Sequence, residues 1–130
     1  SGALSLVDRE GTLLPVPRKG KFPYPMLTGV NESQPAADRR QRVARMLAVL
    51  QDLDREEPPR SGEISEIDLT DPADAAVTVA SAGSAVLLHL GPEHFLERYK
   101  YFLEHIEAWR GQYGAVESVD LRYEKQVIVR

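Results

Sequence analysis

The chain has three histidines, which could bind a metal ion only if the fold brought them together. His94 and His105 fall on one predicted helix, roughly three turns apart at a rise of about 1.5 Å per residue, which is too far to share a metal ion. His89 would have to meet His94 across a Gly-Pro break and recruit a carboxylate such as Glu93 or Glu97. We therefore expect neither a metal site nor any other cofactor.

Acid–base and nucleophilic chemistry also lack a suitable arrangement of residues. Carboxylates occur in pairs, namely Glu63 with Glu66, Asp68 with Asp71, and Glu104 with Glu107. Each pair falls in an amphipathic segment where a solvated polar face explains it, whereas hydrolysis by two carboxylates requires them to face each other across a pocket. No nucleophile elbow, glycine-rich phosphate loop or cysteine occurs. We therefore expect a protein that is not an enzyme.

A group of arginines raises the question of phosphate or nucleic-acid binding. The first half of a predicted helix contains Arg39, Arg40, Arg42 and Arg45. No aromatic residues alternate with them, and the chain carries a net charge of -4, whereas a broad grip on nucleic acid needs a surplus of basic residues. We therefore prefer a solvated helix face to a phosphate site, and we expect no nucleic-acid partner.

The order of predicted helices and strands indicates one α+β domain, with a largely antiparallel sheet and two helices on one face. A chain of 130 residues, of which 42% are hydrophobic, suits a single core. Alternating or apolar runs predict strands at residues 4–7, 12–16, 63–69, 75–80, 85–90, 115–123 and 127–130. Residues 15–35 are rich in proline and glycine and predict an ordered loop. An apolar stripe predicts a helix over residues 35–55, with Ser33 as its N-cap.

The second helix, which is expected to start at Pro92, has the clearest pattern in the chain. Its apolar stripe consists of Phe95, Tyr99, Phe102, Ile106 and Trp109, at helical spacing. Aromatic residues with this spacing belong to a core more often than to a ligand site, so we expect the stripe to be largely buried against the sheet. The alternative is a ligand box formed by Tyr99, Phe102 and Trp109.

The carboxy-terminal strand is the best candidate for a functional surface. Val127, Ile128 and Val129 are β-branched and come last in the chain, which favours a position at or near a sheet edge. Such an edge presents unpaired N–H and C=O groups that a strand from another chain can complete. The sequence therefore indicates a small binding module.

Several short motifs follow one another in a characteristic order. Residues 6–11 carry a D-x-x-G hairpin, residues 25–29 a P-x-L-x-G loop, and residues 88–91 a strand ending in L-x-L-G. Residues 118–123 and 127–130 could form a closing hairpin. In this order, which spans nearly the whole chain, the motifs resemble the extracytoplasmic β domain of the bacterial cell-division proteins FtsQ/DivIB.

The resemblance implies a place in a longer protein. In that family, a short cytoplasmic tail, one membrane helix and a POTRA domain precede the β domain. Residues 1–130 are therefore expected to be a single-domain fragment that lacks all three. The resemblance further implies a non-enzymatic scaffold of the divisome, active in septum formation at the periplasmic face of the inner or cell membrane, with the full-length protein anchored by its N-terminal helix.

The resemblance also implies partners and contact residues. The family's β domain captures the FtsB–FtsL pair by adding a strand of FtsB to its last strand. Carried over by position, the contact surface consists of Arg98, Arg122, Tyr123, Val127, Ile128 and Val129. Of these, Arg98 matches a basic position that meets an acidic partner residue. The turn at residues 124–126 departs from the family because it has no glycine, so the strand register is left open.

A second hypothesis belongs to a different class. The chain would then be a cytoplasmic small-molecule-sensing or regulatory α+β domain. A ligand pocket beneath the second helix would favour this alternative, whereas an open edge on the final strand would favour partner binding.

Overall fold

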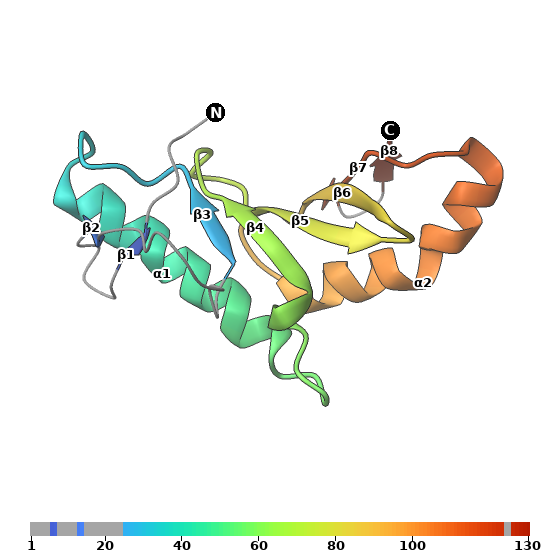
Figure 1. The fold of residues 1–130 in the computed structure, drawn as a ribbon, viewed down its shortest axis with the longest axis horizontal. Coiled ribbons are helices and arrows are strands. Elements are labelled where there is room, and N and C mark those ends of the chain that lie inside the picture. Colours follow the sequence, from blue (N-terminus) through green and yellow to red (C-terminus); the bar gives the residue numbers. More distant parts are fainter. Residues whose placement is uncertain (1–5, 8–12, 15–24, 124–125) are drawn as a thin grey trace.

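The computed structural model describes residues 6–7, 13–14, 25–123 and 126–130 (Figure 1). In chain order the elements are β1 (Leu6–Val7), β2 (Leu13–Leu14), β3 (Met26–Thr28), α1 (Ala36–Leu53), the 3-10 turn η1 (Ser61–Glu63), β4 (Ile64–Asp68), β5 (Ala76–Ser81), β6 (Ser84–His89), α2 (Phe95–Tyr113), β7 (Ser118–Tyr123) and β8 (Gln126–Val129). Every predicted helix and strand has a counterpart. The sequence did not predict β3 and η1.

The main sheet is mixed, so the prediction of a largely antiparallel sheet is wrong, while the α+β class is confirmed. Its six strands follow the order β3-β4-β5-β6-β7-β8. β3 runs parallel to β4 and β6 runs parallel to β7, whereas the other neighbours are antiparallel. Each parallel pair is joined through a helix, because a long crossover returns the chain to the end of the sheet from which it started. Both helices lie along the same face of the sheet (Figure 1).

β3 lies in the segment that was expected to form a loop. Met26 is paired with Glu66 of β4 in parallel register, and Leu27 is buried. A short strand whose partner is distant in sequence leaves no local pattern. Gly29 then turns the chain with a φ of 86°, and a Cβ at this position would collide with the backbone of Thr70.

The opening hairpin is confirmed as far as the structure describes it. β1 and β2 pair antiparallel, with Leu6 opposite Leu14 and Val7 opposite Leu13. They form a two-stranded sheet separate from the main one. The expected turn at residues 8–11 lies outside the described residues.

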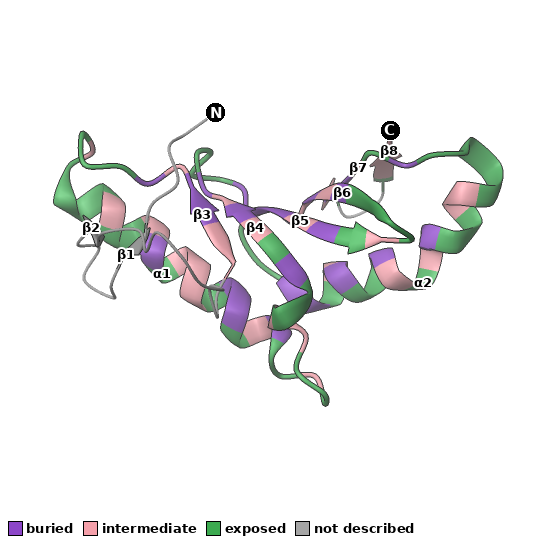
Figure 2. Ribbon diagram, in the orientation of Figure 1, coloured by how far each residue is buried: buried purple, intermediate pink, exposed green. Residues whose placement is uncertain are grey.

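α2 buries most of its predicted stripe against the sheet. The buried members are Phe95, Tyr99, Phe102 and Ile106. Figure 2 shows the same division on both helices, with buried positions toward the sheet and exposed ones on the outer surface. The rings of Tyr99 and Phe102 stack inside the core with centroids 6.1 Å apart, which does not support the ligand box. Trp109 also packs against the core, at the margin of the stripe, and keeps part of its indole in contact with solvent.

α1 is amphipathic along its whole length. Its buried residues are Val43, Val49, Leu50 and Leu53, and charged residues cover much of its outer surface. Across the described ranges, no helix has both the length and the apolar character needed to cross a bilayer.

The start of α2 is stabilised by a residue of α1. The helix begins at Phe95, later than predicted, and His94 precedes it with a left-handed φ of 60° and no side-chain cap of its own. Instead, Oδ2 of Asp52 accepts a hydrogen bond from the N–H of Leu96 at 2.9 Å. A carboxylate suits this place because helix N-termini have unpaired N–H groups and a positive dipole end. This contact fixes the two helices to each other.

Phe102→Ala is expected to lower the free energy of unfolding by about 3–5 kcal/mol, because the enclosed ring leaves a cavity. Trp109→Ala should cost about 1–2 kcal/mol, since part of the indole is already in water. Urea denaturation followed by circular dichroism measures both. Equal losses in the two variants would contradict the difference in burial.

Candidate functional site

β8 forms one outer edge of the main sheet, as the sequence predicts. Within the described residues it pairs with β7 on one side and has no strand on the other. Its sequence, QVIV, has neither the proline nor the charged residues that usually protect an edge. The opposite edge, β3, has three residues and directly follows Pro25. β8 is therefore the edge better suited to accept another strand.

The backbone hydrogen bonds show which groups of β8 face outward. The N–H of Arg130 donates to the carbonyl of Ser118 at 2.9 Å, and Ser118 donates back to Arg130 at 3.0 Å. Backbone groups alternate in direction along an antiparallel ladder, so Ile128 also points toward β7. Val127 and Val129 consequently direct their N–H and C=O groups to the open side.

The side chains of β8 alternate between the two faces of the sheet. Val127 and Val129 pack against the core on the helix side and are half-buried. Ile128 lies on the other face, in a shallow hollow whose lining includes Asp120, Arg122 and residues of β6 to β8. An added strand would therefore meet an apolar face on one side and a polar face on the other.

Arg122 is held by a carboxylate of its own strand. Its Nε donates to Oδ1 of Asp120 at 2.9 Å, and its Nη2 donates to Oδ2 at 2.6 Å. These hydrogen bonds, together with the positive charge, lower the pKa of Asp120 and raise the pKa of Arg122. Arg122 is therefore half of an ion pair and not an isolated cation.

Arg98 reaches from α2 to the end of β6. Its Nη1 donates to the carbonyl of Leu90. A Cβ on Gly91 would collide with the same guanidinium and would lie 3.4 Å from Cγ of Arg122. The structure thus brings Arg98 and Arg122 together at Gly91, although they come from different elements. Arg98 is half-buried and forms no ion pair within the described part of the chain.

Tyr123 is an accessible aromatic side chain beside the edge strand. It is 51% exposed, and its backbone is paired with Gln126 of β8. The guanidinium carbon of Arg122 lies 5.9 Å from the centre of its ring. An amphipathic ring in this position fits the anchors that dominate protein interfaces.

A buried carboxylate behind this site was missed by sequence analysis. Asp74 is 4% exposed; its Oδ1 accepts the N–H of Gly91 at 2.8 Å, and its Oδ2 lies 2.7 Å from Nδ1 of His89. In the sequence, Asp74 is one more polar residue in a turn, and no local signal marks it as buried. It fixes the end of β6, next to which Arg98 and Arg122 meet.

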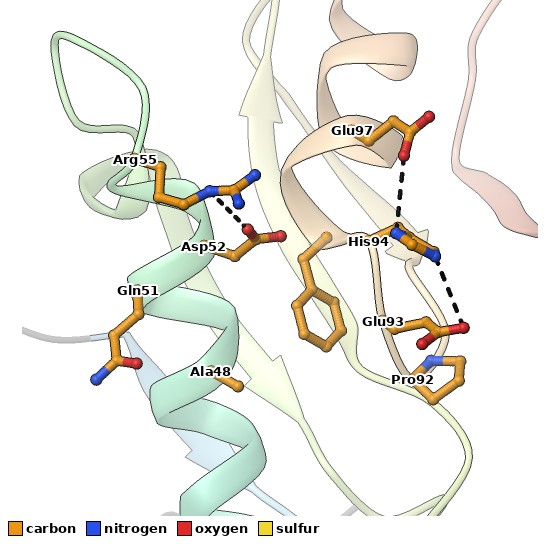
Figure 3. Close-up of a pocket in the computed structure, with 9 residues that line it drawn as sticks. Ala48, Gln51, Asp52, Arg55, Pro92, Glu93, His94 and Glu97 are labelled. Atoms are coloured by element: carbon orange, nitrogen blue, oxygen red, sulfur yellow. Dashed lines mark ion pairs between the residues drawn. The ribbon is translucent and has the colours of Figure 1, made fainter.

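The three histidines stay apart. His89 is held at Asp74, and His105 contacts the backbone of its own helix at 2.8 Å. Nε2 of His94 lies 3.7 Å from Oε1 of Glu93, and its Nδ1 lies 3.8 Å from Oε2 of Glu97 (Figure 3). No group of three His, Asp or Glu residues arranged to hold a metal ion occurs in the residues described.

Arg39, Arg42 and Arg45 of α1 connect loops to the helix. Arg42 donates to the carbonyl of Leu69 at 3.1 Å, and Arg45 donates to the carbonyl of Asp71 at 2.6 Å. Arg39 donates to a carbonyl just before its own helix. These guanidinium groups have structural roles, which weakens the phosphate-site alternative.

A hollow lies between the second half of α1 and the start of α2 (Figure 3). Its charged groups are engaged with one another: Asp52 accepts the N–H of Leu96 and pairs with Arg55 at 3.0 Å. Gln51 points away from the gap between the helices (Figure 3). The polar groups do not converge on a common point, as those of a small-molecule site do.

The fold and the site define a small α+β domain that presents an open sheet edge. Residues 1–122 match the family described as "Cell division protein FtsQ/DivIB, C-terminal". The chain is 37% identical over 128 residues to "Cell division protein FtsQ" of Koribacter versatilis (strain Ellin345), an alignment that covers 97% of this chain and 37% of that protein. The chain belongs to the FtsQ/DivIB family of cell division proteins, which confirms the resemblance, and it spans 37% of the length of this relative.

The family match ends before β8. Tyr123, Val127, Ile128 and Val129 lie beyond residue 122. Their role as contact residues, like that of Arg98 and Arg122, stays a prediction.

Asp120→Asn is expected to lower the free energy of unfolding by about 1 kcal/mol at neutral pH, since Arg122 loses a charge-assisted, partly solvent-screened partner. The folded state lowers the pKa of Asp120, so this contribution is complete above the carboxyl group's ordinary pKa and is lost as the pH falls through the lower, folded value. Urea denaturation at neutral pH and at about pH 2 should show the difference between wild type and variant shrinking in acid. The same difference at both pH values would contradict this account.

Proposed function

We propose that this domain is a non-enzymatic divisome scaffold that binds FtsB/FtsL-like partners by β-strand addition during cell division and septum formation. The observation that carries the proposal is the open edge of β8, which lacks the usual protection against pairing. Strand addition draws affinity from backbone hydrogen bonds, and the outward groups of Val127 and Val129 have no strand partner among the residues that the structure describes.

The side chains around β8 have distinct roles in this proposal. Tyr123 is the exposed anchor beside the edge. Arg98 meets an acidic side chain of the partner, because it is a cation without an ion pair in the described residues. Arg122 supports Tyr123 and the polar face, and Ile128 supplies an apolar contact there. The domain carries no catalytic residue and no cofactor in this proposal.

The proposed location follows from the family. The full-length protein would be anchored by an N-terminal membrane helix and would place residues 1–130, as one domain, on the extracytoplasmic side of the membrane. The match to the FtsQ/DivIB family of cell division proteins is what supports this proposal. The alternative, a cytoplasmic small-molecule-sensing or regulatory domain, gains no support from the hollow between α1 and α2, whose polar groups bind one another.

Val129→Pro is expected to weaken binding of an FtsB-derived peptide about tenfold or more, because it removes an N–H that faces the open side and leaves a partner carbonyl unpaired. Val129→Ala is the matched control, since it keeps the N–H while removing similar packing. Ile128→Pro removes an N–H that faces β7 and should mainly lower thermal stability. Calorimetric titration with a thermal melt of each variant measures both effects. Tight binding by a well-folded Val129→Pro variant would exclude pairing at this edge.

Tyr123→Ala should weaken peptide binding by about tenfold with little change in melting temperature, because the exposed ring supports an interface and not the core. Tyr113→Ala is the control, since Tyr113 is 60% exposed and distant from β8 in the sequence. Arg98→Glu should also weaken binding by placing like charges together. It loses the hydrogen bond to Leu90 as well, so some loss of stability is expected. Wild-type affinity in both Tyr123→Ala and Arg98→Glu would place the partner site elsewhere.

A further inference from the structure

Three ring side chains form a partly exposed stack along one flank of α2. The ring centroids of Tyr101 and His105 are 4.0 Å apart, and those of His105 and Trp109 are 5.6 Å apart. Tyr101 is 43% exposed, and the other two are half-buried. We call Tyr101, His105 and Trp109 the aromatic stack. Large rings left in contact with water mark an interaction surface more often than a structural one when they lie together.

The opposite flank of α2 faces α1. The N–H of Leu96 bonds to Asp52, and Nζ of Lys100 lies 3.5 Å from Glu56. An α-helix turns by about 100° per residue, which puts all three members of the aromatic stack on the flank that faces away from α1.

Arg98 lies on the same flank of α2 as the aromatic stack, and its contacts show which part of the sheet this flank faces. It reaches the carbonyl of Leu90 at the end of β6 and lies beside Arg122 of β7. The aromatic stack continues along the same flank toward the end of α2. It therefore borders the β7–β8 side of the sheet, on the face where Val127 and Val129 pack.

The helices are too narrow to cover this side of the sheet. A helix is about 10 Å wide and strands are about 4.8 Å apart, so two helices cover about four strands, whereas this sheet has six. Val119 and Leu121 of β7 are still buried, but Val127 and Val129 of β8 are only half-buried. A strand added beyond β8 would lie next to the aromatic stack, on the side of the sheet that the helices do not cover.

We infer that the aromatic stack is the second wall of the β8 site and that it selects an incoming strand with aromatic or large aliphatic side chains on its helix-facing side. The inference rests on the proposed strand addition and adds the chemistry of the partner: an extended segment that is apolar at every second position. The surface that such a strand would cover consists of Tyr101, His105, Trp109, Val127 and Val129. A second copy of this chain would offer two valines there, which fill less of the exposed ring surface than large side chains do.

The single tryptophan of the chain makes this wall directly observable. The test titrates the 130-residue chain with a tryptophan-free synthetic peptide derived from FtsB and follows both heat and Trp109 emission. The emission maximum should move to shorter wavelength on binding, because the partly exposed indole loses its remaining contact with water. Tyr101→Ala should weaken affinity about tenfold, whereas Tyr113→Ala, on the same helix but outside the aromatic stack, should retain it. Thermal melts confirm that both variants are folded.

The peptide provides the complementary half of the test. Serine in place of the large apolar residues on one face of the peptide strand should abolish the emission shift and weaken binding, and the same change on the other face should leave the shift in place. Peptide binding with unshifted emission and with wild-type affinity in Tyr101→Ala would overturn this inference and leave strand addition at β8 standing. No binding of the peptide to the wild type would overturn both. A concentration-dependent dimer that Tyr101→Ala abolishes would overturn the choice of partner in favour of a second copy.

Discussion

The mismatch in width between the sheet and its helices is the constraint on which the rest of this structure depends. Six strands extend over a greater distance than two helices can cover. In chain order, α1 connects β3 to β4 and α2 connects β6 to β7. These crossovers place both helices against the middle strands, where they cover the core. β8 then lies beyond the cover of the helices, with half-buried valines on one face and an outer edge that has no strand partner in the described residues.

Polar contacts secure the places where this arrangement changes direction. Asp52 caps α2 from α1, and Asp74 holds both His89 and the N–H of Gly91 at the end of β6. Arg98 closes the same corner through the carbonyl of Leu90. Buried polar groups of this kind are stabilising only when they are paired, and each of these contacts satisfies a backbone or side-chain group. The corner beside β7 and β8 is consequently well defined even though the edge itself is open.

The site residues divide into those that the fold engages and those that it leaves accessible. Arg122 is bound to Asp120 in a bidentate pair, whereas Tyr123 is largely in water and the outward groups of β8 have no strand partner in the described part of the chain. Sequence analysis placed all six residues on one contact surface, because residue type and order do not reveal whether a guanidinium already has a carboxylate. The family match shows what kind of protein this is, but it ends at residue 122, so the case for β8 depends on geometry.

The sequence by itself determined the elements that are specified locally. Helical periodicity located α1 and α2, alternating or apolar runs located β4 to β7, and the β-branched end of the chain predicted β8 as an edge strand. These signals are local because each residue's place on a helix or strand follows from its neighbours. The tertiary structure alone decided the parallel pairing of β3, the burial of Asp74 and the partial exposure of Trp109. Each of these features depends on contacts between segments that are far apart in the sequence. Such contacts are set only when the helices and strands pack together around one core.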